Sequence, residues 1–169
     1  VEATPRAQVI RIILSELTRL ASHQLWWGCM GMDLGAFTPF FYGFRDRELI
    51  TDIFEETCGT RLTMNYMVPG GVMHDIHTDF VRKVQEYLID LKKKLPEYDE
   101  ILSGNQIFIE RTNGIGILSR EDAISYGCSG PVARGSGLSC DIRKSHPYDG
   151  YDKITFKEIL ILYGLNEEA

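Results

Sequence analysis

Asp33 is the residue whose type and surroundings best suit chemistry, because it is a single carboxylate between an apolar helical pattern and an uncharged aromatic run at residues 37–44. A short acidic side chain in these surroundings is expected to be partly buried, and a buried carboxylate needs a partner or a proton. Cys29 lies one helical turn earlier and is expected to face the same side. The alternative is that Asp33 only caps a helix or pairs with an arginine.

Two clusters of charged side chains could suggest reactive sites but have simpler explanations. Arg45–Glu48 is a dense run of alternating charge, which indicates an interface or an internal ion-pair network rather than a catalytic group. His74–Asp79 contains residue types that bind metals, but its two histidines are three positions apart and do not form the i and i+4 pair of a helix-borne site. It directly precedes a helical pattern, where Thr78 as N-cap and Asp79 in the first turn explain the polarity.

Cysteine and glycine usage give no sign of a bound cofactor. The cysteines form no CxxC pair, so we predict free or buried thiols in a reducing compartment and no zinc or iron–sulfur site built by this chain alone. The glycine-rich residues 114–117 and 134–137 do not match a phosphate-binding loop. The cysteines are Cys29, Cys58, Cys128 and Cys140.

The elements that must position Asp33 are two amphipathic helices. Apolar residues at spacings of three and four predict a first helix that begins after its cap, Thr4, and ends near Gly28. A second helix is predicted over residues 39–58, with Thr38 as its N-cap and a glycine directly after its end.

Shorter signals organise the rest of the chain. Residues 62–68 alternate between apolar and polar side chains, which predicts a strand before the turn at residues 69–71. A long helix follows, which Pro96 is expected to kink or split. Ser119 is expected to cap a short helix that ends near Gly127. The predicted fold class is therefore mainly α with short β segments.

Length, composition and charge exclude several classes of protein. At 169 residues, with 44% hydrophobic and 11% aromatic residues, the chain can bury the core of one domain or part of one. Its net charge of −6 does not favour nucleic-acid binding. The longest apolar run falls far short of the ~18 residues that span a bilayer, and no secretory signal is visible. Membrane association is therefore expected to come through partners.

The run from Asp33 to Glu48 resembles the hydrogenase-like quinone-site subunit of respiratory complex I, also called its D-type or 49 kDa-type subunit. The likeness makes residues 1–156 the central part of that subunit and leaves residues 157–169 as a divergent tail without assignment. Many further matches in the same order strengthen the resemblance. They are Arg11 to His23, Asn65-Tyr66 with Pro69 to Val72, Asn105 to Phe108, Arg134 to Gly137, Asp141 to Lys144, Pro147-Tyr148 and Tyr151-Asp152.

The resemblance implies a helical core like that of nickel–iron hydrogenase large subunits, without the metal. It also implies a proton-translocating oxidoreductase that passes electrons from NADH or another donor to quinone. The subunit is expected to form part of the quinone-reduction site, next to the terminal iron–sulfur cluster of a partner subunit. That partner, the C-type subunit and quinone are the expected partners, with NAD held by another subunit. The implied location is peripheral, on the cytoplasmic side of the bacterial plasma membrane or the matrix side of the inner mitochondrial membrane.

Site residues also follow from the resemblance. In the family a His and a Tyr hold the quinone headgroup, and an Asp that is hydrogen-bonded to the His matches Asp33. A carboxylate behind a His fixes its orientation and favours its protonated form. Asp33 is therefore the expected catalytic-site residue, with Cys29 and Phe41 as expected lining of the quinone pocket. The family's His and Tyr come from segments before Val1, so the chain is expected to be a central fragment that alone is inactive and holds no cofactor.

Thr63 bears on which quinone the resemblance implies. Many family members place a His at the matching position, close to the partner's terminal cluster, and its ionisation links the cluster potential to pH. Thr63 cannot ionise in the working range. A weakly pH-dependent cluster potential is therefore expected, which suits a low-potential quinone such as menaquinone.

Two other classes of function stay open. One is the large subunit of an energy-converting nickel–iron hydrogenase, which requires CxxC pairs in flanking sequence. The other is a docking or scaffold domain without redox chemistry. The sequence before Val1 would distinguish the three, because a His-bearing quinone motif indicates complex I and a CxxC pair indicates hydrogenase.

Overall fold

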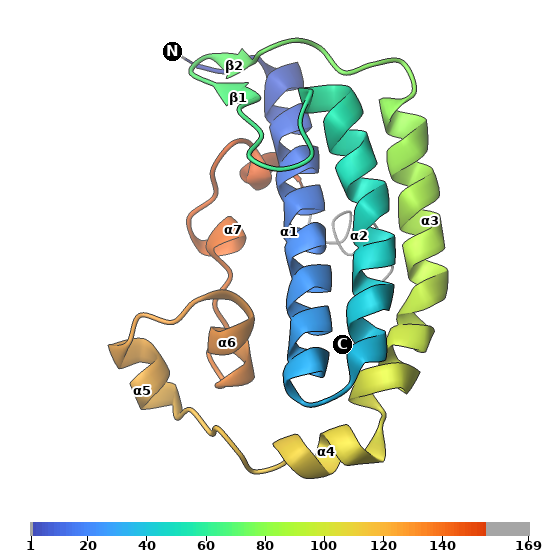
Figure 1. The fold of residues 1–169 in the computed structure, drawn as a ribbon. Coiled ribbons are helices and arrows are strands. Elements are labelled where there is room, and N and C mark those ends of the chain that lie inside the picture. Colours follow the sequence, from blue (N-terminus) through green and yellow to red (C-terminus); the bar gives the residue numbers. More distant parts are fainter. Residues whose placement is uncertain (1, 155–169) are drawn as a thin grey trace.

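Three long helices form the body of the part of the chain that this computed structural model describes, residues 2–154. Figure 1 shows α1 (Pro5–Asp33), α2 (Phe37–Cys58) and α3 (Phe80–Tyr98) side by side. A small antiparallel ribbon of β1 (Met67–Val68) and β2 (Gly71–Val72) lies at the end of the bundle where α1 begins. The fold is thus mainly α with short β segments, as predicted.

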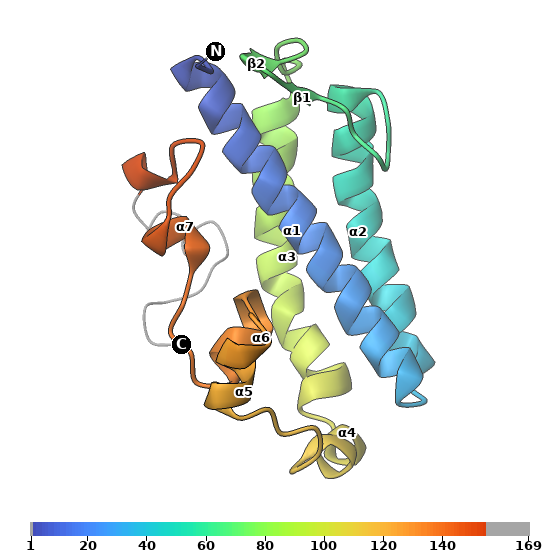
Figure 2. The same cartoon turned by 90° about the vertical axis from the view of Figure 1, so that its left-hand side faces the viewer.

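The remaining elements are short and return along one side of the bundle. Figures 1 and 2 show α4 at the end where α1 passes into α2, and α7 beside α1. In the described part of the chain, no helix is long and apolar enough to cross a membrane. The tail assigned to residues 157–169 lies outside the described residues. The short elements are η1 (Asp99–Ser103), α4 (Gln106–Thr112), α5 (Arg120–Ser125), α6 (Gly130–Gly135), α7 (Ile142–Ser145) and η2 (Tyr151–Lys153).

α1 begins where the sequence predicts, because the Thr4 side chain accepts a hydrogen bond from the Ala7 N–H at 3.3 Å. Its predicted end near Gly28 is wrong, since the helix continues to Asp33. Gly28 is a buried helical residue that faces α2, and a Cβ there would lie 3.0 Å from the Cα of Phe40. Glycine at this position allows two helices to approach closely instead of ending one of them.

α2 starts two residues earlier than predicted, at Phe37, with Ala36 at the N-cap. Thr38 is therefore not the cap, and the proline after it lies in the first turn, where a missing N–H costs no helical hydrogen bond. The predicted end is confirmed. Gly59 adopts a left-handed φ of 77° and its N–H donates to the carbonyl of Glu55 at 2.9 Å.

The strand predicted over residues 62–68 is mostly wrong. Only Met67 and Val68 pair, with Val72 and Gly71 respectively. Thr63 adopts a positive φ of 42°, which no strand accommodates. Within the described residues the sheet has two strands; the Tyr66 carbonyl still accepts from the Met73 N–H at 3.0 Å, but an extended segment at residues 62–65 has no neighbour to pair with.

α3 begins at Phe80 with Asp79 at the N-cap position and no side-chain cap, so the predicted cap at Thr78 is wrong. Pro96 was expected to kink or split the helix. The helix instead continues through Pro96 to Tyr98, and its geometry changes only after that, in the π-helical turn η1. A proline removes one hydrogen bond from the helical ladder, and π turns occur where that ladder is interrupted. The cap at Ser119 is confirmed, since its side chain accepts from the N–H of Asp122 at 3.0 Å.

One hydrophobic core lies between the three long helices, and a second face of α1 is covered by the returning chain. On that second face Glu16 is buried, and its carboxylate accepts hydrogen bonds from Arg143 at 3.1 Å and from the Tyr151 hydroxyl at 2.5 Å. These contacts hold residues 141–151 against α1. The main core consists of Ile10, Leu14, Leu17, Ala21, Ile50, Ile53, Phe54, Tyr66, Phe80, Val84, Tyr87 and Leu91.

Candidate functional site

Asp33 is the last residue of α1, and its side chain is exposed. Among the described residues its carboxylate has no hydrogen-bond or ion-pair partner, so the expectation of partial burial is wrong for this part of the protein. The reason lies in the next residues, because the chain reverses at 34–36 and the aromatic run begins α2 instead of covering α1. Asp33 is left as an open carboxylate at the end of a helix.

The turn after Asp33 closes α1 tightly. The N–H of Leu34 donates to the carbonyls of Met30 and Gly31 at 3.2 Å, and the N–H of Ala36 donates to Gly31 at 2.8 Å. Gly35 supplies the left-handed φ of 88° that such a turn requires. The last turn of α1, which is fully described, contains no basic side chain. Asp33 therefore adds negative charge at the negative end of the helix dipole.

Cys29 and Phe41, the two residues expected to line a pocket with Asp33, lie close by along the chain but do not enclose it. Cys29 is a half-buried free thiol one turn before Asp33 on α1. Phe41 is exposed on α2, with its ring edge-on to that of Phe40 at 5.9 Å. Within residues 2–154 no hydrogen bond, ion pair or ring contact joins the three residues. Other protein would have to complete a pocket here.

Large aromatic side chains near Asp33 are open to solvent. Trp26, Phe37 and Phe41 are 61%, 63% and 66% exposed. Trp26 lies seven residues before Asp33 on α1, and Phe37 and Phe41 are four residues apart on α2, so each pair shares one helix face. Exposed apolar rings on the two helix ends next to this turn are typical of a surface that another molecule covers.

Of the charged run at residues 45–48, for which an interface or an internal ion-pair network was predicted, Arg45 and Asp46 form an internal network, whereas Glu48 pairs with Arg61 at the surface. Asp46 is 1% exposed and accepts hydrogen bonds from Arg45 at 2.9 Å, Lys94 at 2.8 Å and the Tyr98 hydroxyl at 2.7 Å. Burial opposes ionisation of Asp46, but these three donors outweigh it and hold the pKa of the carboxyl below its ordinary value. The Tyr98 ring also stacks on Trp27 at 4.3 Å, which links this network between α2 and α3 to α1.

The polar segment at residues 74–79 forms ion pairs instead of a ligand set. Asp75 pairs with Arg6 at 3.1 Å, and Asp79 pairs with Arg82 at 3.2 Å. His77 lies 3.5 Å from Glu56. Over residues 2–154, no three His, Cys, Asp or Glu side chains gather closely enough to hold a metal ion.

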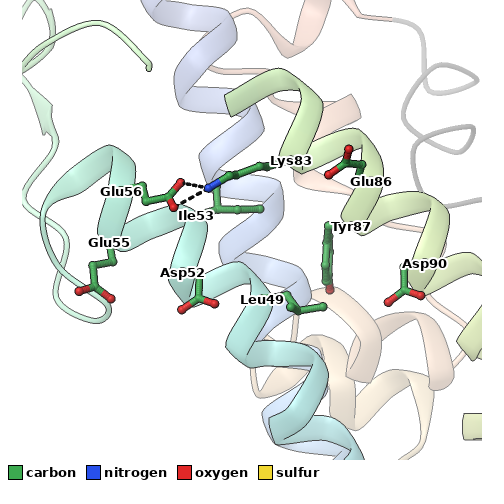
Figure 3. A pocket seen from close by; sticks show the side chains of 9 residues that line it. All are labelled: Leu49, Asp52, Ile53, Glu55, Glu56, Lys83, Glu86, Tyr87 and Asp90. Atoms are coloured by element: carbon green, nitrogen blue, oxygen red, sulfur yellow. Dashed lines mark hydrogen bonds and ion pairs between the residues drawn. The ribbon is translucent and has the colours of Figure 1, made fainter. Parts of the chain in front are cut away.

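A groove of about 610 Å³ between α2 and α3 is rich in carboxylates, as Figure 3 shows. Each of these acids already faces a cation: Glu56 pairs with Lys83 at 2.5 Å, and the others pair with arginine or lysine on the same surface. Solvated, paired carboxylates of this kind do not make a reactive centre. The acidic lining residues are Asp52, Glu55, Glu56, Glu86 and Asp90.

One contact of the Asp33 turn has no signal in the local sequence. Arg111 on α4 donates a hydrogen bond to the carbonyl of Leu34, 77 positions earlier in the chain. The network of Glu16 with Arg143 and Tyr151 was missed for the same reason. Both contacts depend on packing between segments that are far apart in the sequence, and local sequence patterns do not predict such packing.

Comparison with known proteins identifies the family of this chain. The sequence model of the family described as "Respiratory-chain NADH dehydrogenase, 49 Kd subunit" matches residues 33–164. The fused C/D subunit of NADH-quinone oxidoreductase from Bacteroides fragilis is 51% identical over 164 residues, which cover 97% of this chain and 31% of that protein. The D subunit of NADH-quinone oxidoreductase from Clostridium beijerinckii is 46% identical over 160 residues, 95% of this chain and 43% of that protein.

A solved structure agrees with the sequence matches. A chain of the membrane-bound sulfane sulfur reductase, an archaeal respiratory membrane complex, superposes with a TM-score of 0.86 at 34% identity over 91% of this chain and 42% of that chain. The present chain spans less than half the length of each of these relatives. On the family match and these identities, the chain belongs to the 49 kDa subunit family of respiratory-chain NADH dehydrogenase.

Proposed function

We propose that this chain is part of the quinone-site subunit of a proton-translocating oxidoreductase that transfers electrons from NADH or another donor to quinone. The observation that carries the proposal is the family match that begins at Asp33, supported by relatives of about 50% identity that are named as subunits of NADH-quinone oxidoreductase. Residues 1–156 then form the central part of the subunit. The remaining length of the relatives supplies the other parts of the site.

The proposed chemical role of Asp33 is to orient and charge a base that touches the quinone headgroup. Reduction of a quinone to a quinol consumes two electrons and two protons, so the site needs a group that can donate a proton. Asp33 stands exposed at the negative end of a 29-residue helix, where a cationic partner is electrostatically favoured. An imidazolium brought from another segment of the subunit suits that position.

The proposed surroundings of the headgroup include Cys29 and Phe41. Their role as pocket lining is supported by their places on the two helix ends that flank Asp33. The exposed rings of Trp26, Phe37 and Phe41 provide apolar surface for the quinone or for a neighbouring subunit. Quinone, with menaquinone as the proposed species, is the substrate, and NAD belongs to another subunit of the complex.

The proposed partners are the subunit that carries the terminal iron–sulfur cluster and the C-type subunit. The fused C/D name of the Bacteroides fragilis relative supports close association with a C-type part. The proposed location of the assembled enzyme is peripheral to the membrane, on the cytoplasmic side in a bacterium or on the matrix side in a mitochondrion.

The test is to tag the full-length protein in its own cell, isolate the complex that co-purifies and assay it with NADH or other donors and a menaquinone analogue. The expected result is donor-dependent quinone reduction together with the spectroscopic signals of iron–sulfur clusters. Hydrogen turnover with stoichiometric nickel would replace the proposal with the hydrogenase alternative. A complex without redox centres would replace it with a docking role.

A further inference from the structure

The turn that follows Asp33 is hydrogen-bonded, through one side chain, to a segment far away in the sequence. Inside the turn, the N–H groups of Leu34, Gly35 and Ala36 donate back to the last carbonyls of α1. The carbonyl of Leu34 instead accepts a hydrogen bond from the guanidinium of Arg111, which lies on α4. Figures 1 and 2 show α4 beside this end of the bundle.

Arg111 provides positive charge next to the negative end of α1. The C-terminus of α1 is the negative end of a long helix, its last turn has no basic side chain, and Asp33 adds a full negative charge. In the described part of the chain, no carboxylate pairs with the Arg111 guanidinium. Its positive charge therefore acts on the helix end and is not neutralised by another ion pair there.

The support behind Arg111 is ordered, whereas packing between α4 and the turn is loose. Asn105 caps α4, because its side chain accepts from the Ile107 N–H at 2.9 Å, and Leu102 before it is buried. A cavity of about 210 Å³ lies between α4 and the turn, so the two are not closely packed at this point. The cavity is lined by Leu34, Gly35, Ala36, Ile101, Leu102, Asn105, Ile107, Phe108 and Arg111.

We propose that Arg111 is a positioning residue of the quinone site: by binding the Leu34 carbonyl it fixes the turn at residues 34–36 and thereby the direction of the Asp33 carboxylate. The inference rests on the proposed function for its catalytic consequence, but the anchoring of the turn is independent of it. An error of about 1 Å in the position of an orienting group is enough to slow a reaction by roughly 100-fold. Arg111 thus acts on the chemistry only through Asp33.

The experiment uses the complete oxidoreductase with Arg111→Ala and Arg111→Lys in the full-length subunit. Arg120→Ala is the matched control, because Arg120 is an exposed arginine on α5 whose guanidinium has no hydrogen bond or ion pair within residues 2–154. Amide hydrogen exchange of the peptide that spans residues 33–37 reports the anchoring. Quinone kinetics and donor-driven reduction of an artificial acceptor report the chemistry and the integrity of the electron-transfer chain.

In Arg111→Ala we expect faster exchange at residues 34–36 and a fall in kcat for quinone of about 10- to 100-fold, with artificial-acceptor reduction unchanged. Arg111→Lys, which keeps the charge and a donor, should recover most of both properties, and Arg120→Ala should change neither. If Arg111→Ala does not assemble, Arg111→Gln is judged by the same criteria.

If amide hydrogen exchange at residues 34–36 is unchanged in the Arg111 variants, Arg111 does not anchor the turn. This conclusion is independent of the role of Asp33. Faster exchange with unchanged quinone kinetics would overturn the positioning role. Failure of the proposed function gives a different result, in which Asp33→Asn itself leaves quinone reduction intact while the turn still loosens in Arg111→Ala.

Discussion

Asp46 is a buried carboxylate that three donors keep ionised between α2 and α3. Replacing it with asparagine would remove the buried charge that Arg45 and Lys94 share, and would leave Arg45 with Glu97 at 3.4 Å and Lys94 with Asp90 at 2.5 Å. A hydrogen bond to a charged group typically contributes about 1.5–3 kcal/mol of folding free energy, and the exposure of the Arg45 and Lys94 side chains keeps the loss within that range. We therefore expect Asp46→Asn to lower stability by that order in urea unfolding at neutral pH. Asp99→Asn, at an exposed position, is the control and should change little.

The pH dependence of this contribution has a definite sign. The pKa of Asp46 is lower in the folded protein than in the unfolded chain. Its stabilisation is therefore fully present above the ordinary carboxyl value of about 4 and is lost as pH falls through the folded value. The stability gap between wild type and Asp46→Asn should narrow as the pH is lowered below about 4. A gap of constant size throughout acid titration would refute the assignment.

Thr63 offers a test of the proposed contact with the partner subunit that carries the terminal cluster. It is exposed and holds a positive φ of 42°, which His adopts more readily than a β-branched residue. If this position lies close to the terminal cluster of the partner, Thr63→His should add a pH-dependent charge there and steepen the slope of cluster potential against pH. Redox titrations of the assembled enzyme at several pH values measure the slope. A wild-type potential that already falls steeply across neutral pH would show the inference to be mistaken.

Asp33 marks the limit of what neighbouring residues predict. Its position at the end of α1 follows from local pattern, but its burial was predicted from the aromatic residues that come next, and those begin α2 and turn away. Asp46, by contrast, lies in a run for which an interface or an ion-pair network was predicted, and its neighbour Arg45 does bind it, but its other two donors, Lys94 and Tyr98, come from α3 and have no local signal. The anchoring of Leu34 by Arg111 could not be predicted, since it joins residues 77 positions apart.

Among the helices and strands, α1 and α2 depend on glycines for their close approach. A Cβ at Gly43 would lie 2.6 Å from the carbonyl oxygen of Gln24, a backbone atom that cannot easily move aside. We expect Gly43→Ala to destabilise the fold by about 1–3 kcal/mol through overpacking. Gly135→Ala is the matched control, because a Cβ there meets no atom within 4 Å.

Thermal unfolding of the two alanine variants side by side gives the comparison. Gly135→Ala should be neutral or slightly stabilising, since alanine is favoured in a helix. Equal melting temperatures for both variants would mean that the helices can separate without loss of stability and that the close approach is unimportant.

The boundaries of these elements were predicted well where a local hydrogen bond sets them. Thr4, Gly59 and Ser119 all act at the predicted ends through contacts within five residues. The predictions failed where tertiary contacts decide. Gly28 continues α1 because α2 lies against it, and residues 62–65 are not a strand because, within the described residues, they lack a neighbour to pair with.

At the largest scale, apolar surface remains exposed across residues 2–154. A groove of about 310 Å³ between α1 and α3 has an almost entirely apolar lining, with Val9 and Val81 each about half exposed. Together with the exposed rings on the two helix ends next to the Asp33 turn, it makes this chain a poor independent monomer. We expect the isolated chain to be mainly helical, to self-associate or unfold easily, and to bind no iron, nickel or flavin. Light scattering and metal analysis test this, and a stable monomer with stoichiometric metal would contradict it.

The most direct test of the proposed role of Asp33 is Asp33→Asn in the complete enzyme. Asparagine keeps the shape and a hydrogen bond but removes the negative charge. Loss of that charge should lower the pKa of the quinone-site His by ~1–3 units, at roughly 1.4 kcal/mol per unit. The measurement is the quinone reductase rate per mole of reducible terminal cluster in mutant and wild type. We predict a fall of about 10-fold or more with assembly and donor-driven cluster reduction preserved. An unchanged ratio, or a loss of assembly and cluster content in parallel, would mean that Asp33 has only a structural role.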